Sequence, residues 1–210
     1  MGPRLSCRLV SLDMVLCWEP DGTSPRAAVR FSVASMIFRE TKLPGVFEIS
    51  LETKADDRGF FARTWCQKEF EAHGLSSRLV QCSLSHSVQQ GTLRGMHYQV
   101  PPHAETKLVR CTKGAIYDVV LDLRPQSTTF KNWIAVVLTA ENRNAVYVPE
   151  GCAHGFLTLE DETEVLYQMS ESYNAESARG VRWDDPAFQI TWPQKVQVMS
   201  QRDRSYANFE

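Results

Sequence analysis

Apolar and polar residues alternate with a period of two along most of this chain, and that pattern leaves few folds open to it. The alternating runs begin near Met36, are rich in Val, Ile, Leu and Tyr, and are separated by Gly, Pro and Asn. A period of two places successive side chains on opposite faces of a strand, so each run predicts a half-buried strand. The clearest runs are residues 46–51, 108–111, 116–123, 133–138, 145–148 and 164–169. Many short strands at regular spacing predict an all-β sandwich or closed barrel.

Two segments depart from this pattern. Residues 67–73 are rich in helix formers and are followed by Gly74, which predicts a short helix with a glycine cap. Residues 1–35 mix arginines with acidic residues, and Asp13 interrupts their apolar stretch, so a secretory signal is not expected. We expect residues 1–35 to be a poorly ordered extension or an upstream start, with a weak transit peptide as the alternative. No internal repeat or linker interrupts residues 36–210, which predicts a single β domain.

Composition and charge limit the kinds of molecule that this protein is expected to bind. The net charge is -2 and there is no sustained Lys/Arg stripe, which argues against a nucleic acid held by phosphate neutralisation. No apolar run is long enough for a membrane-spanning helix. The six cysteines are scattered and form no C-x-x-C pair, as is typical of reduced thiols in a cytoplasmic protein.

The segment 93–99, Leu-Arg-Gly-Met-His-Tyr-Gln, lies at the end of a predicted strand. Regular alternation would place Arg94 and Met96 on one face, and Gly95 and His97 on the other. A single histidine in a β domain usually has a structural role. However, it titrates near neutrality, so it can serve as a base wherever it lies in a pocket. Both interpretations of His97 remain open at this level.

Residues 148–156, Val-Pro-Glu-Gly-Cys-Ala-His-Gly-Phe, resemble the second half of the cupin signature, whose histidine binds a transition metal in metal cupins. The H-x-H pair of the first half is absent here. Two histidines and a carboxylate could still form a facial triad. A metal-dependent cupin isomerase or dioxygenase is therefore an alternative, with candidate ligands His97, His103, Glu105 and His154.

A larger set of short motifs follows in a characteristic order. They are residues 57–61, 93–99, 107–110, 117–119, 122–124, 149–156, 166–168, 183–186, 190–193 and 200–203. Each is weak alone, but together they cover residues 36–203 and resemble the dTDP-4-dehydrorhamnose 3,5-epimerase family. The resemblance implies a jelly-roll β fold of the cupin type with a few short helices. It also implies a cytoplasmic homodimer that needs neither a metal nor another cofactor.

The resemblance further implies a reaction and its residues. The substrate would be a nucleotide-diphosphate keto sugar, dTDP-4-dehydro-6-deoxyglucose, inverted at C3 and C5 on the way to dTDP-rhamnose or a related deoxysugar. His97 would be the base, Asp203 would orient it, and Tyr167 would be the acid on the opposite face of the sugar. Positions that match substrate contacts are Arg58, Gln81, Ser83, Arg94, Lys107, His154 and Arg202.

The chemistry suits these residue types. Removing a proton next to a ketone leaves an enolate, whose oxygen needs a donor such as Lys107 in a dry site. A neutral base near pH 7 is needed on one face, and a phenol on the other can return a proton with inversion. Arginine matches diphosphate oxygens through its guanidinium fork. No glycine-rich dinucleotide fingerprint follows a predicted strand.

Three positions depart from the family pattern. Arg63 stands where the family usually has an acidic residue, Ser83 where it has Asn, and Ala178 where it often has Glu. All three match nucleotide- or sugar-binding positions, so the identity of the substrate is open. Arg63 could favour an extra phosphate or form a salt bridge at the dimer interface. Inversion of a single carbon, and a binding module without catalysis, are further alternatives.

Overall fold

The computed structural model describes residues 6–11, 14–18, 25–30 and 35–209. The chain divides into two compact units, one formed by Met1–Ser35 with Thr53–Ala62 and the other by Met36–Glu52 with Arg63–Glu210. No helix within the described ranges has the length and apolar character that crossing a membrane requires.

The first unit contains two small antiparallel sheets. Strands β1 (Ser6–Ser11), β2 (Met14–Trp18) and β3 (Pro25–Arg30) form one sheet, and β6 (Lys54–Asp56) pairs with β7 (Gly59–Phe61) as a hairpin. The expectation of a poorly ordered extension falls partly on residues 1–5, 12–13, 19–24 and 31–34, which lie outside the described residues. That expectation, and the domain boundary at Met36, remain predictions.

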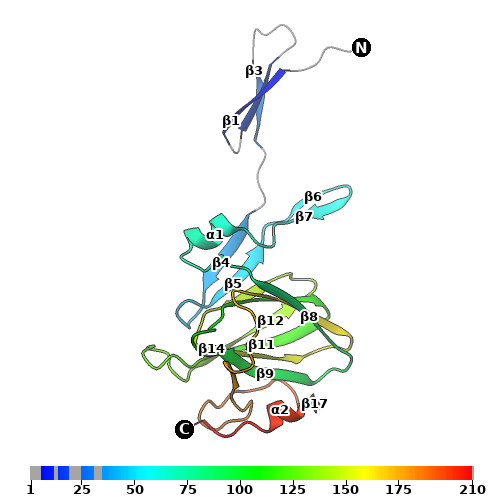
Figure 1. The fold of residues 1–210 in the computed structure, drawn as a ribbon. Coiled ribbons are helices and arrows are strands. Elements are labelled where there is room, and N and C mark those ends of the chain that lie inside the picture. Colours follow the sequence, from blue (N-terminus) through cyan, green and yellow to red (C-terminus); the bar gives the residue numbers. More distant parts are fainter. Residues whose placement is uncertain (1–5, 12–13, 19–24, 31–34, 210) are drawn as a thin grey trace. The chain divides into compact units, whose positions relative to one another are not determined.

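The second unit is built from two sheets of six strands each (Figure 1). The first sheet has the order β4-β5-β13-β10-β15-β8, and its strands are Met36–Glu40, Phe47–Leu51, Ala145–Val148, Lys107–Lys113, Thr163–Met169 and Gln81–Ser87. The second has the order β12-β11-β14-β9-β16, with strands Trp133–Thr139, Ala115–Asp122, Cys152–Thr158, Thr92–Gln99 and Ala178–Gly180. Strand β17 (Val198–Met199) pairs in parallel with β9.

Three apolar clusters hold this unit together. The first fills the space between the sheets, with Val109 and Val165 from one sheet and Val120 and Phe156 from the other. A second covers the outer face of the first sheet, where Phe70 of the helix α1 (Gln67–Ala72) is buried. The third lies on the outer face of the second sheet, beneath the chain that follows β16. A sandwich requires only that each sheet bury its inner apolar face, and here the outer faces carry apolar clusters as well.

The predicted strands and helix are confirmed. Each of the six alternating runs coincides with a strand, namely β5, β10, β11, β12, β13 and β15. Helix α1 ends at Ala72, and Gly74 follows in the left-handed region with a φ of 70°. Alternation did not reveal β14, because all seven of its residues are buried and its polarity does not alternate.

Candidate active site

A cavity of about 630 Å³ lies in the second unit, lined by residues of β8, β9, β10, β14 and β15 together with the chain near Asp203. It brings together residues that are distant in sequence, as a jelly roll allows when strands from both sheets meet at one end. Of the ten site residues expected from the sequence, the cavity is lined by His97, Tyr167, Asp203, Gln81, Ser83, Arg94, Lys107, His154 and Arg202.

His97 and Asp203 form the most strongly constrained pair in this cavity. Nε2 of His97 lies 2.7 Å from Oδ1 of Asp203, whose side chain is 5% exposed. Burial alone would raise the pKa of Asp203, but the hydrogen bond and charge of His97 outweigh it, so that pKa lies below its ordinary value. An ionised Asp203 accepts a hydrogen bond from the Nε2–H group of His97, which leaves the lone pair of a neutral imidazole on Nδ1. The ring is thus held in the tautomer that a general base needs.

Strand β9 contains an irregularity that changes which side chains face the cavity. Across the β9–β14 pair, His97 is opposite His154 while Arg94 is opposite Phe156, so three steps on β9 match two on β14. This extra residue is a β-bulge, which redirects the side chains that follow it. Arg94 and His97 therefore both line the cavity, whereas Met96 is buried in the outer cluster. The expectation that Arg94 and His97 face opposite sides was wrong for this reason.

The bulge depends on two glycines that touch each other. A Cβ added at Gly95, whose φ is 139°, would lie 2.5 Å from Cα of Gly155. A Cβ added at Gly155 would in turn lie 2.9 Å from the backbone oxygen of Arg94. Such distances exclude a side chain at either position unless the strands separate. The two strands that carry His97 and His154 approach each other because both residues are glycine.

Lys107 carries a positive charge into the same cavity. Its Nζ donates to the backbone oxygen of His97 at 3.2 Å and pairs with Oε1 of Glu105 at 3.0 Å. The side chains of Lys107 and Glu105 are 12% and 10% exposed, so the pair is largely shielded from water. A shielded ammonium close to a base can stabilise negative charge that develops on a substrate oxygen.

Tyr167 and His154 complete the polar wall of the cavity. The Tyr167 hydroxyl lies 3.2 Å from Oγ of Ser85, and burial raises the pKa of Tyr167 to about 12. The His154 ring stands edge-on to Tyr167, with centroids 6.3 Å apart, and its Nε2 lies 2.8 Å from Oδ2 of buried Asp118. His154 thus lies between His97, its neighbour across the strands, and the Tyr167 ring. The phenol stays protonated near neutral pH.

Two arginines also line the cavity. Arg94 donates to the backbone oxygen of His86 at 2.9 Å, and Arg202 donates to the hydroxyl of Tyr206 at 3.0 Å. Sequence reasoning missed Tyr173 and Arg179, which also line the cavity. They lie before and within β16, where the family pattern drew attention only to Ala178.

Two arginines that match substrate-binding positions are not among the residues that line this cavity. Arg58 lies in the β6–β7 turn of the first unit, where it pairs with Asp56. Its role in binding substrate remains a prediction. Arg63 donates to Oε1 of Glu69 in α1 at 2.6 Å and does not line the cavity. The structure therefore shows Arg63 in an ion pair within the chain, and both interpretations of Arg63, an extra phosphate or a salt bridge at the dimer interface, remain predictions.

The candidate ligands of the metal alternative are not arranged around a common point. His97 and His154 each direct Nε2 to an aspartate, and His103 does not line the cavity. In the parts of the chain that the structure describes, no three His, Cys, Asp or Glu side chains form a group suited to a metal ion.

Comparison with known proteins places the chain in a family. The sequence profile described as dTDP-4-dehydrorhamnose 3,5-epimerase matches residues 40–210. The chain belongs to this family. The dTDP-4-dehydrorhamnose 3,5-epimerase of Shigella flexneri is 41% identical over 171 residues, which cover 81% of this chain and 94% of that protein.

Solved structures of the family confirm the predicted cupin-type jelly roll. The Bacillus anthracis dTDP-4-dehydrorhamnose 3,5-epimerase, solved with TDP and PPi bound, is 39% identical with a TM-score of 0.80, covering 83% of this chain and 100% of that one. ChmJ, a 3'-monoepimerase from Streptomyces bikiniensis solved with dTDP-quinovose, is 31% identical with a TM-score of 0.74, covering 80% and 85%. The family thus includes both a 3,5-epimerase and an enzyme named for one inversion.

Proposed function

We propose that this chain is a cofactor-free epimerase that inverts C3 and C5 of a dTDP-4-keto-6-deoxyhexose, converting dTDP-4-dehydro-6-deoxyglucose to dTDP-4-dehydrorhamnose. The observation that carries the proposal is the His97–Asp203 pair, which lines the same cavity as the buried phenol of Tyr167. An oriented base and a protonated acid in one pocket are what inversion next to a ketone requires. Membership of the epimerase family supports the same reaction.

In the proposed first step, Nδ1 of His97 removes the proton from the carbon beside the ketone. The C–H electron pair moves into the ring and onto the ketone oxygen, which becomes an enolate oxygen. Lys107 and His154, which line the cavity next to His97, are placed to stabilise that charge. Asp203 in turn stabilises the imidazolium that forms on His97.

In the proposed second step, the Tyr167 hydroxyl gives its proton to the opposite face of the same carbon, and the ketone is restored. Because burial raises the pKa of Tyr167 to about 12, the phenol holds its proton until the enolate is ready to accept it. The phenolate left behind recovers a proton from water, and His97 loses the proton it took. No electrons are gained or lost overall, which is consistent with the expectation of no cofactor.

The diphosphate of the substrate is proposed to bind through Arg94 and Arg202, which both line the cavity. The guanidinium fork of arginine matches phosphate oxygens. The Bacillus anthracis relative was solved with TDP bound, which supports a thymidine nucleotide. Ser83 and Ala178 line the cavity at positions where the family usually has Asn and Glu, so they are the places where nucleotide or sugar preference would differ.

The decisive experiment incubates the protein with dTDP-4-dehydro-6-deoxyglucose in heavy water and locates the deuterium by NMR. We expect deuterium at both C3 and C5 and formation of dTDP-4-dehydrorhamnose. His97→Asn should slow exchange at both carbons by about 10²- to 10⁴-fold, the usual contribution of a general base. Exchange by this variant at near the wild-type rate would remove His97 from the base role. Deuterium at C3 alone would favour the single-carbon alternative, for which the likeness to ChmJ is the supporting observation.

The assembly is proposed to be a homodimer. Strand β8 lies at the edge of the first sheet and exposes Leu84, and Val88 directly follows the strand; these two residues are 60% and 66% exposed. An apolar edge strand is a liability for a monomer, and a second copy would cover it. Sedimentation velocity should give twice the mass of the chain, and Leu84→Lys should shift the measured mass toward that of the monomer.

We also propose a cytoplasmic location, which the free thiols of Cys66, Cys82, Cys111 and Cys152 support.

A further inference from the structure

Asp203 meets His97 from a segment with little regular structure of its own. We call residues 198–209 the strap; its regular elements are β17 and the single helical turn α2 (Gln201–Arg204). A helix of four residues is not stable by itself in water, because forming the first turn is costly. The position of Asp203 therefore depends on what fixes the strap on each side of α2.

On one side the strap is fixed directly to the catalytic strand. β17 pairs in parallel with β9, with Val198 beside Thr92 and Met199 beside Leu93. Oγ of Ser200 then accepts from the backbone N–H of Asp203 at 3.1 Å, which caps the helical turn. These contacts set where the turn begins, but they leave the chain beyond Asp203 unconstrained.

On the other side a buried carboxylate holds the backbone of the strap. Asp185 is 2% exposed, and its Oδ2 accepts from the backbone N–H of Phe209 at 2.6 Å. Its Oδ1 accepts from Ala187 at 2.8 Å, so the carboxylate is itself fixed by the turn that carries it. Hydrogen bonds to a charged acceptor are stronger than those between neutral groups. The hydrogen bond from Phe209 to Asp185 is also largely shielded from solvent.

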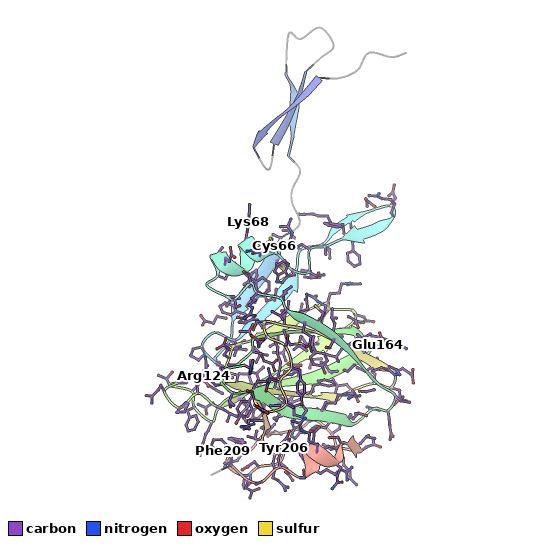
Figure 2. The ribbon with its side chains drawn as sticks, in the orientation of Figure 1. Cys66, Lys68, Arg124, Glu164, Tyr206 and Phe209 are labelled. Carbon is purple, nitrogen blue, oxygen red and sulfur yellow. The ribbon has the colours of Figure 1, made fainter. Side chains whose placement is uncertain are left out.

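The Phe209 ring is held as well as its backbone. It packs against Phe188 and Phe130, with ring centroids 5.2 Å and 6.3 Å away, and Nζ of Lys131 lies 5.0 Å from its centre. Phe188 belongs to the outer cluster of the second sheet, so the ring ties the strap to the jelly roll itself. Figure 2 labels Phe209 and Tyr206 on this part of the chain.

Between the two anchors, Tyr206 lies against the strand neighbour of the base. Gly180 of β16 is paired with His97, and a Cβ at Gly180 would lie 2.2 Å from Cζ of Tyr206. The Tyr206 ring also stands edge-on to the His97 ring, with centroids 6.3 Å apart. The strap thus passes directly beside His97 before it reaches Phe209.

We infer that Phe209 and Asp185 are positioning residues that latch the strap and thereby hold the Asp203 carboxylate against His97. Neither residue lines the cavity, so the effect on the reaction is transmitted through the strap. The effect on turnover rests on the proposed function, whereas the latch itself can be measured without substrate.

The test compares Phe209→Ala and Asp185→Asn with wild type and with Phe38→Ala. Phe38 is a partly buried phenylalanine in the cluster under α1, remote from the strap, and serves as the matched control. Three quantities are measured: tryptic cleavage after Arg202 and Arg204, the NMR signal of the His97 ring proton shared with Asp203, and the rate of deuterium incorporation at saturating substrate. Assignment of the ring proton uses its absence in Asp203→Asn.

We expect both latch variants to be cleaved about tenfold faster in the strap, because local opening becomes easier. The shared proton should broaden or disappear, and turnover should fall by about 10- to 100-fold, as misplacement of a catalytic group by about 1 Å can produce. Phe209→Leu, which keeps an apolar side chain, should recover most of each loss. Phe38→Ala should leave all three quantities as in wild type.

Cleavage and a ring proton unchanged in both latch variants would overturn the latch. Equal changes in Phe38→Ala would also overturn it, since the effect would then be a general loosening of the fold. If Phe209→Ala does not fold, Asp185→Asn decides alone, because it keeps the side-chain volume while it removes the charge and one of the two acceptor oxygens. A loosened strap and lost ring proton with undiminished turnover would confirm the latch and refute the proposed role of the His97–Asp203 pair.

Discussion

At the scale of single residues, the acid and the base of this site have been given different surroundings. The His97 side chain is 40% exposed and touches an ionised carboxylate, while Tyr167 is partly buried against the core and touches a hydroxyl. A base must accept protons near neutrality, and an acid must keep its proton until it is needed. The contrast follows from position: His97 faces the open cavity from β9, and Tyr167 lies deeper on β15, against the core between the sheets.

Tyr167→Phe tests this division of roles. The variant should lose net inversion by about 10²- to 10⁴-fold while the first proton exchange at C3 falls much less, since His97 remains. Because the pKa of Tyr167 is raised to about 12, wild-type inversion should show no loss from phenol ionisation between about pH 6 and about pH 9. NMR in heavy water measures exchange and inversion separately. Equal loss of both would take Tyr167 out of the acid role.

Gly155→Ala tests the close approach that carries His97. Its new Cβ would lie 2.9 Å from the backbone oxygen of Arg94, so β9 and β14 must separate, and we expect a loss of about 2–3 kcal/mol in the free energy of unfolding. Gly74→Ala is the control, because Gly74 has a positive φ but open space around its Cβ, and it should cost only about 1 kcal/mol. Chemical denaturation measures both. Gly155 has no positive φ, so a loss no larger than that of Gly74→Ala would contradict the effect assigned to the close contact.

The sequence predicted which residues form the site better than it predicted which way their side chains point. Motifs alone brought forward nine residues that line the cavity, because polar groups with chemical roles stand out in an apolar pattern. What the pattern missed was the bulge, since one extra residue in β9 is visible only when β9 is paired with β14. Asp118 was not predicted as a site residue, because its role also depends on strand pairing. It occupies a buried place in an alternating strand, and its partner His154 lies on the neighbouring strand.

At the scale of elements, the loop between β11 and β12 shows how a buried charge can organise a turn. The Asp122 side chain is fully buried and accepts hydrogen bonds from Arg124, Ser127 and Thr129. Burial raises the pKa of Asp122, but these donors outweigh it, and the net pKa is lowered. Sequence placed the two flanking strands correctly, whereas the network between them depends on side chains that fold back on one acceptor.

Asp122→Asn should reveal that network through its pH dependence. A carboxyl with a lowered folded pKa stabilises the fold above its unfolded pKa of about 3.9, and this stabilisation is lost as the pH falls through the folded value. At neutral pH we therefore expect the variant to be about 3 kcal/mol less stable, the usual cost of breaking a buried charged network. Below about pH 4 the difference in the free energy of unfolding between wild type and Asp122→Asn should become smaller. Denaturation at several pH values measures it, and a gap independent of pH would contradict the assignment.

At the scale of the whole molecule, the cavity and its chemistry belong to one of the two compact units. Every residue that lines the cavity lies between Gln81 and Asp203, within the unit formed by Met36–Glu52 and Arg63–Glu210. The strands that compose its two sheets run from β4, which begins at Met36, to β17. Strand β4, the first strand of the sandwich, thus begins where the alternation in the sequence begins, while the domain boundary predicted at Met36 stays a prediction.

A chain that begins at Met36 tests whether residues 1–35 matter to the epimerase domain. We expect it to fold with an unchanged unfolding midpoint and to catalyse deuterium exchange at C3 and C5 within about twofold of the full chain, since each group that lines the cavity is retained.

The backbone nitrogen of Met36 donates to Oε2 of Glu69 at 2.9 Å. In the shortened chain that nitrogen becomes an ammonium facing the same carboxylate, so the contact should persist as an ion pair. Glu69→Gln in both chains is the control for this contact, and it should destabilise the shortened chain more. A shortened chain that unfolds earlier or loses exchange would show that residues 1–35 contribute to the domain.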